Sequence, residues 1–149
     1  MKSLGFRRTV GAILGAGAVA AVALAGVQPA TAATNNCTES DGRMCLYVNS
    51  SPYGYNAEYG RNAQMPSLNH NVNGGTKYYF KAGSKGSVGT GGLVWNNAAA
   101  ARNLHWDDHH FRVYSESNYR GASQTIYDPY TYNLNEGVKN ENTSYRWIS

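Results

Sequence analysis

The chain has 149 residues, with 13 Lys and Arg against 9 Asp and Glu and a formal net charge of +4. Three of the cations lie within the first eight residues and precede an uncharged stretch, Val10–Val27, which is followed by Ala30-Thr31-Ala32. A cationic start, an apolar stretch and an Ala-x-Ala site are typical of a secretory signal peptide. We therefore expect residues 1–32 to be removed and the mature protein to be secreted into the extracellular space, with the export route left open.

Removal of residues 1–32 changes the charge argument. The remainder, 33–149, has 10 Lys and Arg against 9 Asp and Glu, a net charge of +1. No block of like charge remains, so the chain lacks the electrostatic footprint of a protein that binds nucleic acid or an anionic membrane. We expect no nucleic-acid partner and no stable membrane association; a retained anchor at Val10–Val27 is the alternative to cleavage. The remaining 117 residues are enough for one domain.

The two cysteines of the chain, Cys37 and Cys45, both lie near the start of the expected mature protein. An even pair in an exported protein predicts a disulfide, here between an N-terminal arm and a strand at Met44–Val48. A closed loop of this length stabilises by about 2 to 3 kcal/mol in the chain-entropy model. The alternative is a redox or metal pair, but the spacing matches neither a Cys-x-x-Cys motif nor a zinc knuckle.

A pattern of an aromatic residue and a glycine seven positions later occurs twice, at an offset of 67 residues. Its residues are Tyr47, Gly54, Tyr114, Tyr119 and Gly121. Because glycine adopts φ > 0 without steric cost, each copy predicts a point where a strand folds back on itself, with Tyr119 as a lid over the fold. Pro52 stands in the place of Tyr119 in the first copy, which therefore lacks its lid. Two similar units in one domain follow, unless these are ordinary turn glycines beside surface tyrosines.

Short β-prone runs between Gly- and Asn-rich turns predict an all-β fold. The first unit contains a Gly- and Asn-rich region, Asn69–Gly92. The second has an alternating strand at Ala122–Tyr127 and a turn at Asp128–Tyr130. One segment, Asn96–Asn103, has the composition of a short helical turn with Asn caps at its ends.

A second repeated motif ends each unit: Asn96–Ala101 in the first and Lys139–Ser144 in the second. Together with the Tyr-x4-Tyr-x-Gly signature, these stretches resemble the βγ-crystallin superfamily. Within it, the chain is most similar to the secreted actinobacterial peptidase inhibitors of metalloproteinase-inhibitor type. The residues that carry the resemblance are Cys37, Gly42, Cys45, Leu46-Tyr47, Trp95–Ala99, Arg102-Asn103, Val113-Tyr114, Tyr119–Gly121 and Asn142–Ser144.

The resemblance implies a single domain over 33–149, a βγ-crystallin-like sandwich of two Greek-key motifs at about 43–103 and 111–148. It implies a secreted inhibitor, not an enzyme, that inserts a loop into the cleft of an extracellular protease, most readily a metalloendopeptidase, and that needs no cofactor. No Gly-x-Ser-x-Gly elbow or phosphate loop points to an enzyme instead. The alternative is a non-inhibitory binding or structural module of βγ-crystallin type, with calcium, a glycan or a protein as its partner.

The inhibitory residues cannot be assigned from the sequence. The first unit is longer by 24 residues between its glycine and its late motif, and most of them lie in Asn69–Gly92. Loops of this kind often hold function, so a contact surface is expected there. A flexible insert without a function is the alternative.

Calcium-binding members of the superfamily take oxygen ligands from both late motifs, as a hard cation requires. Here Ala100 and Ala101 replace hydroxyl residues, and Lys139 replaces an Asn or Asp. The remaining candidate ligands are Asn97, Asn140 and Thr143. We expect the loss of oxygens and the added cation to weaken calcium binding severely, and we assign no metal site.

A further candidate site is the run His105-Trp106-Asp107-Asp108-His109-His110, whose side chains include donors that suit a transition metal. The run lacks the His-Glu-x-x-His spacing of a zinc protease. We expect an exposed polar loop, with adventitious metal binding as the alternative.

Overall fold

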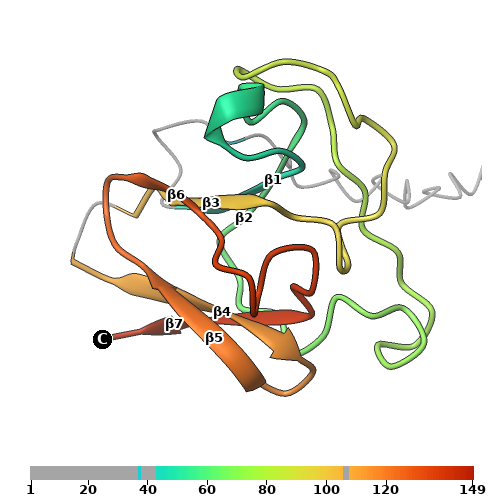
Figure 1. Ribbon diagram of the computed structural model, residues 1–149. Helices are drawn as coiled ribbons and strands as arrows, with labels where there is room; N and C mark the ends of the chain where they lie inside the picture. Colours follow the sequence, from blue (N-terminus) through green and yellow to red (C-terminus); the bar gives the residue numbers. More distant parts are fainter. Residues whose placement is uncertain (1–36, 38–42, 106–107) are drawn as a thin grey trace, which may run out of the picture.

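The computed structural model describes residues 37, 43–105 and 108–149, so the predicted signal peptide lies outside the described residues. The described chain forms seven strands and one 3-10 turn (Figure 1). The elements are β1 (Met44–Tyr47), η1 (Ser51–Tyr53), β2 (Glu58–Arg61), β3 (Ala100–Asn103), β4 (His110–Glu116), β5 (Arg120–Ile126), β6 (Thr131–Asn133) and β7 (Ser144–Ile148).

The strands form two antiparallel sheets, with the orders β2-β1-β3-β6 and β5-β4-β7. The sheets lie as two layers, and η1 lies on the far side of the first sheet (Figure 1). The fold is therefore all-β, as the sequence predicts, and the two sheets are consistent with a β-sandwich.

The alternation of side chains along each strand divides the apolar residues between two clusters. In β1, Met44 and Leu46 belong to the main core between the sheets, whereas Cys45 and Tyr47 belong to a smaller cluster with Cys37. The main core also draws on the second sheet, where Phe111 and Val113 are fully buried. The smaller cluster is where Cys37 contacts the sheet.

Each unit contributes a segment to the sheet of the other. β6, which belongs to the second unit, pairs with β3 in the first sheet. In return, Met65 of the first unit pairs with Tyr145 of β7, through Met65 N–H to Tyr145 O at 2.8 Å and Tyr145 N–H to Met65 O at 3.0 Å. Neither sheet is therefore complete without residues from both halves of the chain.

The helical turn expected at Asn96–Asn103 is wrong. Ala100–Asn103 is strand β3, which pairs with β1 on one side and β6 on the other. The intrinsic helix preference of alanine is weak compared with the ladder hydrogen bonds and the burial that a central strand offers. The small side chains of Ala100 and Ala101 are both fully buried, on opposite faces of the sheet.

A buried asparagine connects the ends of the two units. The Asn142 side chain is fully buried, and its Oδ1 accepts hydrogen bonds from the backbone N–H groups of Asn97 (3.0 Å) and Ala98 (2.7 Å). Its Nδ2 donates to the backbone oxygen of Val94 at 2.8 Å. One carboxamide thus satisfies three backbone groups of the first unit from a position in the second.

We predict that Asn142→Ala lowers the free energy of unfolding by about 2 to 4 kcal/mol, because it leaves three backbone polar groups without their partner. Asn142→Asp is expected to be similarly harmful, since its second oxygen would face the Val94 carbonyl in place of a donor. Chemical denaturation measures both, with Asn71→Ala on the exposed surface as the control. A loss below about 1 kcal/mol for Asn142→Ala would contradict this role.

Candidate functional site

The fold-back of the second unit is closed by a serine. Gly121 has φ of 77°, as the repeat predicts. The Ser144 hydroxyl accepts a hydrogen bond from Tyr119 N–H at 3.1 Å and donates to Glu116 O at 2.6 Å. The Tyr119 ring lies 5.9 Å from that of Tyr114, so the expected lid is in place.

The first unit closes its fold-back differently. Gly54 also has φ of 77°, but Pro52, at the position of Tyr119, has no N–H to donate. The ring of Tyr55 lies 5.5 Å from that of Tyr47. The expectation that this copy has no lid is therefore wrong, because an aromatic residue after the glycine covers Tyr47 instead.

Backbone hydrogen bonds show how the two late motifs correspond. Asn96 N–H donates to Asn142 O at 3.0 Å, and Asn140 N–H donates to Ala98 O at 2.8 Å. The two bonds are equivalent, because Asn96 and Ala98 of the first unit lie 44 residues before Asn140 and Asn142 of the second. The match of Asn96 to Lys139, made on sequence alone, is thus one residue out of register, and Asn96 corresponds to Asn140.

The corrected match strengthens the argument against calcium. Thr143 Oγ1 donates to Asn96 Oδ1 at 2.8 Å, so a pair of side-chain oxygens that could face a cation is engaged in a hydrogen bond. On the other side of the junction, Ala99 corresponds to Thr143 and Ala100 to Ser144, so the alanines at the hydroxyl positions are Ala99 and Ala100 and not Ala100 and Ala101. Ala99 has no side-chain oxygen to offer beside Asn140. Asn97 contributes its backbone N–H to Asn142.

The long insert of the first unit is held to the sheet by its backbone. Lys81 exchanges two hydrogen bonds with Glu58 of β2, at 2.8 and 2.9 Å. Farther along, Ala57 N–H donates to Val88 O at 3.1 Å, and Phe80 N–H donates to Gly92 O at 2.9 Å. Phe80 is buried in the main core. The alternative of an insert without fixed structure therefore does not describe this segment.

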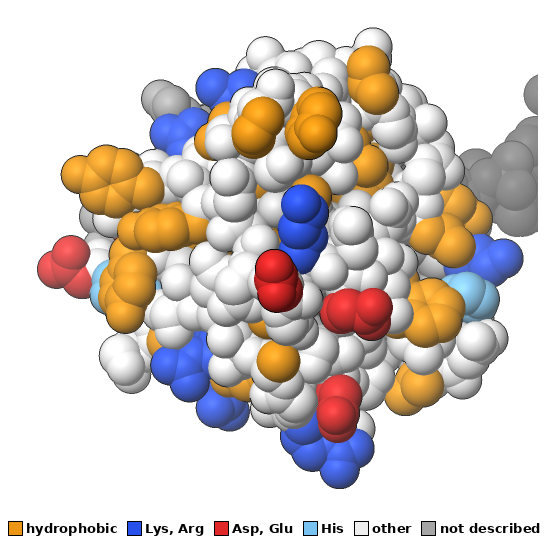
Figure 2. All heavy atoms as spheres, viewed as in Figure 1, with side chains coloured by type: hydrophobic (Ala, Val, Ile, Leu, Met, Phe, Trp, Pro, Cys, Tyr) orange, Lys and Arg blue, Asp and Glu red, His pale blue; other side chains and the backbone are white. Residues whose placement is uncertain are grey.

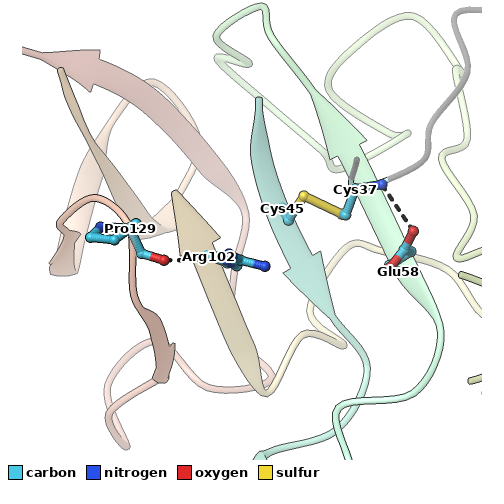
Figure 3. The surroundings of a disulfide bond; sticks show 5 residues. All are labelled: Cys37, Cys45, Glu58, Arg102 and Pro129. Atoms are coloured by element: carbon cyan, nitrogen blue, oxygen red, sulfur yellow. Dashed lines mark hydrogen bonds between the residues drawn. A yellow bond between two sulfur atoms is a disulfide. The ribbon is translucent and has the colours of Figure 1, made fainter. Parts of the chain in front are cut away.

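Glu58 lies beside Cys37 in the first sheet, where the insert pairs with β2 (Figure 3). Its carboxylate is buried, and Oε1 accepts a hydrogen bond from Cys37 N–H at 2.9 Å. Among the described residues, Oε2 has no hydrogen-bond partner. A Cβ on Gly83 would lie 1.8 Å from Glu58 Cδ, so glycine is required for the insert to cover this side chain.

The disulfide between Cys37 and Cys45 is present, as the sequence predicts, and it fixes Cys37 beside β1. The Tyr47 side chain lies in the same cluster, and burial raises its pKa to about 12, with a further increase from the Glu58 charge. Arg102 opposes that increase, and its Nε donates to Pro129 O at 3.3 Å (Figure 3).

The histidine run does not gather its imidazoles at one point. The rings of His105 and His109 lie 5.1 Å apart, whereas His110 packs against Tyr127 at 4.6 Å. Trp106 and Asp107 are outside the described residues. In the part of the chain that the structure describes, no group of three or more His, Cys, Asp or Glu side chains is arranged to hold a metal ion.

Comparisons with protein-family models, with curated proteins and with solved structures found no match to this chain. The described residues include no helix long and apolar enough to span a membrane. Function therefore has to be argued from the geometry of the chain itself.

We predict that millimolar Ca²⁺ leaves the melting temperature of the protein within about 1 °C of its value in EDTA. A ligand that does not bind the folded protein at the concentration used adds no stability. Calorimetric titration is expected to show no micromolar site. A micromolar affinity that Thr143→Ala abolishes would contradict this prediction and would assign the junction of the late motifs as a cation site.

Proposed function

We propose that the protein is a secreted peptidase inhibitor, directed most readily at metalloendopeptidases, on a scaffold of two βγ-crystallin-type Greek keys. Its contact surface would be the upper loop surface, which consists of Tyr53 and residues 84–90. In Figure 1, η1 and the yellow-green part of the insert lie side by side at the top of the molecule.

The strand arrangement supports the Greek-key part of the proposal. Each unit consists of a hairpin, a segment that crosses to the other sheet and a strand that returns beside the hairpin. Leu134 N–H donates to Ala99 O and Leu68 N–H donates to Thr143 O, so the two crossing segments make corresponding contacts. This exchange, together with the two glycine fold-backs, is the pattern that the resemblance implies.

The main observation in favour of an inhibitor is an exposed apolar side chain in a loop whose backbone is hydrogen-bonded to the sheet. Val88 is 64% exposed, yet its carbonyl accepts a hydrogen bond from Ala57 at the edge of β2. The preceding turn is closed by two hydrogen bonds between Gly83 and Gly86, both at 3.1 Å. Because such a loop is ordered before it binds, a protease cleft could bury Val88 at a small entropic cost.

Tyr53 supplies a second anchor next to the loop. Its side chain is 72% exposed. The turn that presents it is tied to β6, through Ser51 N–H to Asn133 Oδ1 at 2.8 Å and Asn133 Nδ2 to Ser51 Oγ at 3.0 Å. Exposed tyrosines on a fixed backbone are frequent hot spots of protein interfaces.

The test is a titration of the secreted form of the protein against a thermolysin-type metalloendopeptidase, with a serine protease and a cysteine protease in parallel. We expect dose-dependent inhibition of the metalloendopeptidase. Val88→Asp should weaken it at least 10-fold, because a carboxylate would have to be desolvated in the cleft. Val72→Asp is the matched control, since Val72 is 58% exposed but lies on a separate turn of the same insert.

A flat response against all three protease classes would refute inhibition and would favour a non-inhibitory binding module. Inhibition that Val88→Asp and Val72→Asp leave unchanged would retain the function but place the contact surface elsewhere.

A further inference from the structure

A second group of aromatic residues, two of them exposed and two half-buried, lies away from the insert. It consists of His110, Tyr127, Tyr130 and Tyr132, and we call it the tyrosine patch. The Tyr127 ring lies 4.6 Å from the ring of His110 and 6.5 Å from that of Tyr132. Figure 2 shows hydrophobic side chains beside a histidine at its left edge, where Figure 1 has the connection between β5 and β6.

Two of the four rings are exposed, and the half-buried His110 and Tyr132 hold the ring of Tyr127 between them. Tyr127 is 49% exposed and Tyr130 is 66% exposed. Tyr127 makes near-perpendicular contacts with both of its ring neighbours, at interplanar angles of 67° and 61°. The turn between Tyr127 and Tyr130 is fastened by the hydrogen bond from Arg102 to Pro129 O. Large aromatic faces that stay exposed on a fixed backbone mark interaction sites.

The surroundings of the patch are polar and carry charges of both signs. Gln124 donates to Asn133 O at 3.2 Å and accepts from Asn135 N–H at 2.7 Å, next to the patch. Nearby cations are Arg102 and Arg112, which donates to Thr125, and nearby acids are Asp108 and Asp128. A phosphate-rich ligand would need several cations without acids beside them, and the described surroundings do not provide such a group.

We propose that the tyrosine patch binds an uncharged polysaccharide of β-1,4-linked glucose or N-acetylglucosamine units. In such a sugar the hydroxyls are equatorial, so each ring has a flat face of C–H groups that stacks on a tyrosine ring. The phenol hydroxyls and the Asp128 carboxylate would then meet the sugar hydroxyls at the rim. This binding is a further activity and is independent of protease inhibition.

The size of the patch favours a polysaccharide over a protein. A stable protein interface buries about 800 Å² on each partner, which requires some 20 to 30 residues. The tyrosine patch offers a few rings along one edge of the molecule, which is a strip that a sugar chain can cover. In Figure 1, the yellow-green part of the insert and the connection between β5 and β6 lie apart, whereas the turn that presents Tyr53 is hydrogen-bonded to Asn133, next to Tyr132 of the patch.

The test is calorimetric titration of the protein with chitohexaose and with cellohexaose, supported by sedimentation with insoluble chitin and cellulose. We expect binding to at least one of the two glycans. Tyr127→Ala and Tyr130→Ala should each weaken it at least 10-fold. The matched controls are Tyr79→Ala and Tyr53→Ala, which remove tyrosines of comparable exposure elsewhere, 43% for Tyr79, and which should stay within about 2-fold.

Absence of binding to both glycans would overturn the proposal, and so would binding that all four variants weaken equally. Binding of heparin or of a protein in place of the neutral glycans would also overturn it. Tyr127→Ala should leave protease inhibition unchanged, and Val88→Asp should leave glycan binding unchanged, so the two proposals can fail separately.

Discussion

The carboxamide of Asn142 joins the two units of the fold. It is buried at the junction of the two units, and its three hydrogen bonds all go to backbone groups of the other half of the chain. A hydrophobic side chain of the same size would leave those groups unsatisfied in the interior, where each costs 1 kcal/mol or more. The junction therefore specifies one relative placement of the two sheets, and the crossing segments complete both of them.

The two units close their fold-backs with different contacts. In the second, Ser144 bridges Tyr119 and Glu116 and closes the fold-back internally. In the first, Pro52 has no N–H to donate, and Ala100 stands at the position of Ser144. The backbone donor and the hydroxyl that would accept from it are therefore both absent. Here the disulfide attaches Cys37 beside β1, and the Tyr55 ring packs on Tyr47. The insert pairs with the same side of the molecule through the backbone of Ala57 and Glu58, so the altered unit is also the one that presents the upper loop surface.

Much of the fold follows from short-range signals in the sequence. Glycines at φ of 77° in both copies of the repeat, the disulfide and the all-β class could all be predicted, because each depends on local chemistry. The alanine-rich strand β3 could not, since its conformation is imposed by partners on both sides. The one-residue shift between the late motifs is also hidden in the sequence, because only hydrogen bonds between distant segments reveal it.

Among the residues of the candidate site, Glu58 gives a weak sequence signal, as an acid in an otherwise uncharged run from Pro52 to Gly60. For the proposed surfaces, the sequence indicates the insert but not Val88 or the tyrosine patch, because His110 joins the three nearby tyrosines only in the folded chain.

Native-state hydrogen exchange tests the central role of the Asn142 junction most directly. The amides of Asn97 and Ala98 should exchange only through global unfolding, with a free energy equal to that from denaturation, because opening them requires the two units to separate. The amide of Val72, on an exposed turn of the insert, should exchange far faster. If Asn97 and Ala98 instead exchange by low-energy local opening, at a rate like that of Val72, the junction does not hold the two units together and the account is wrong.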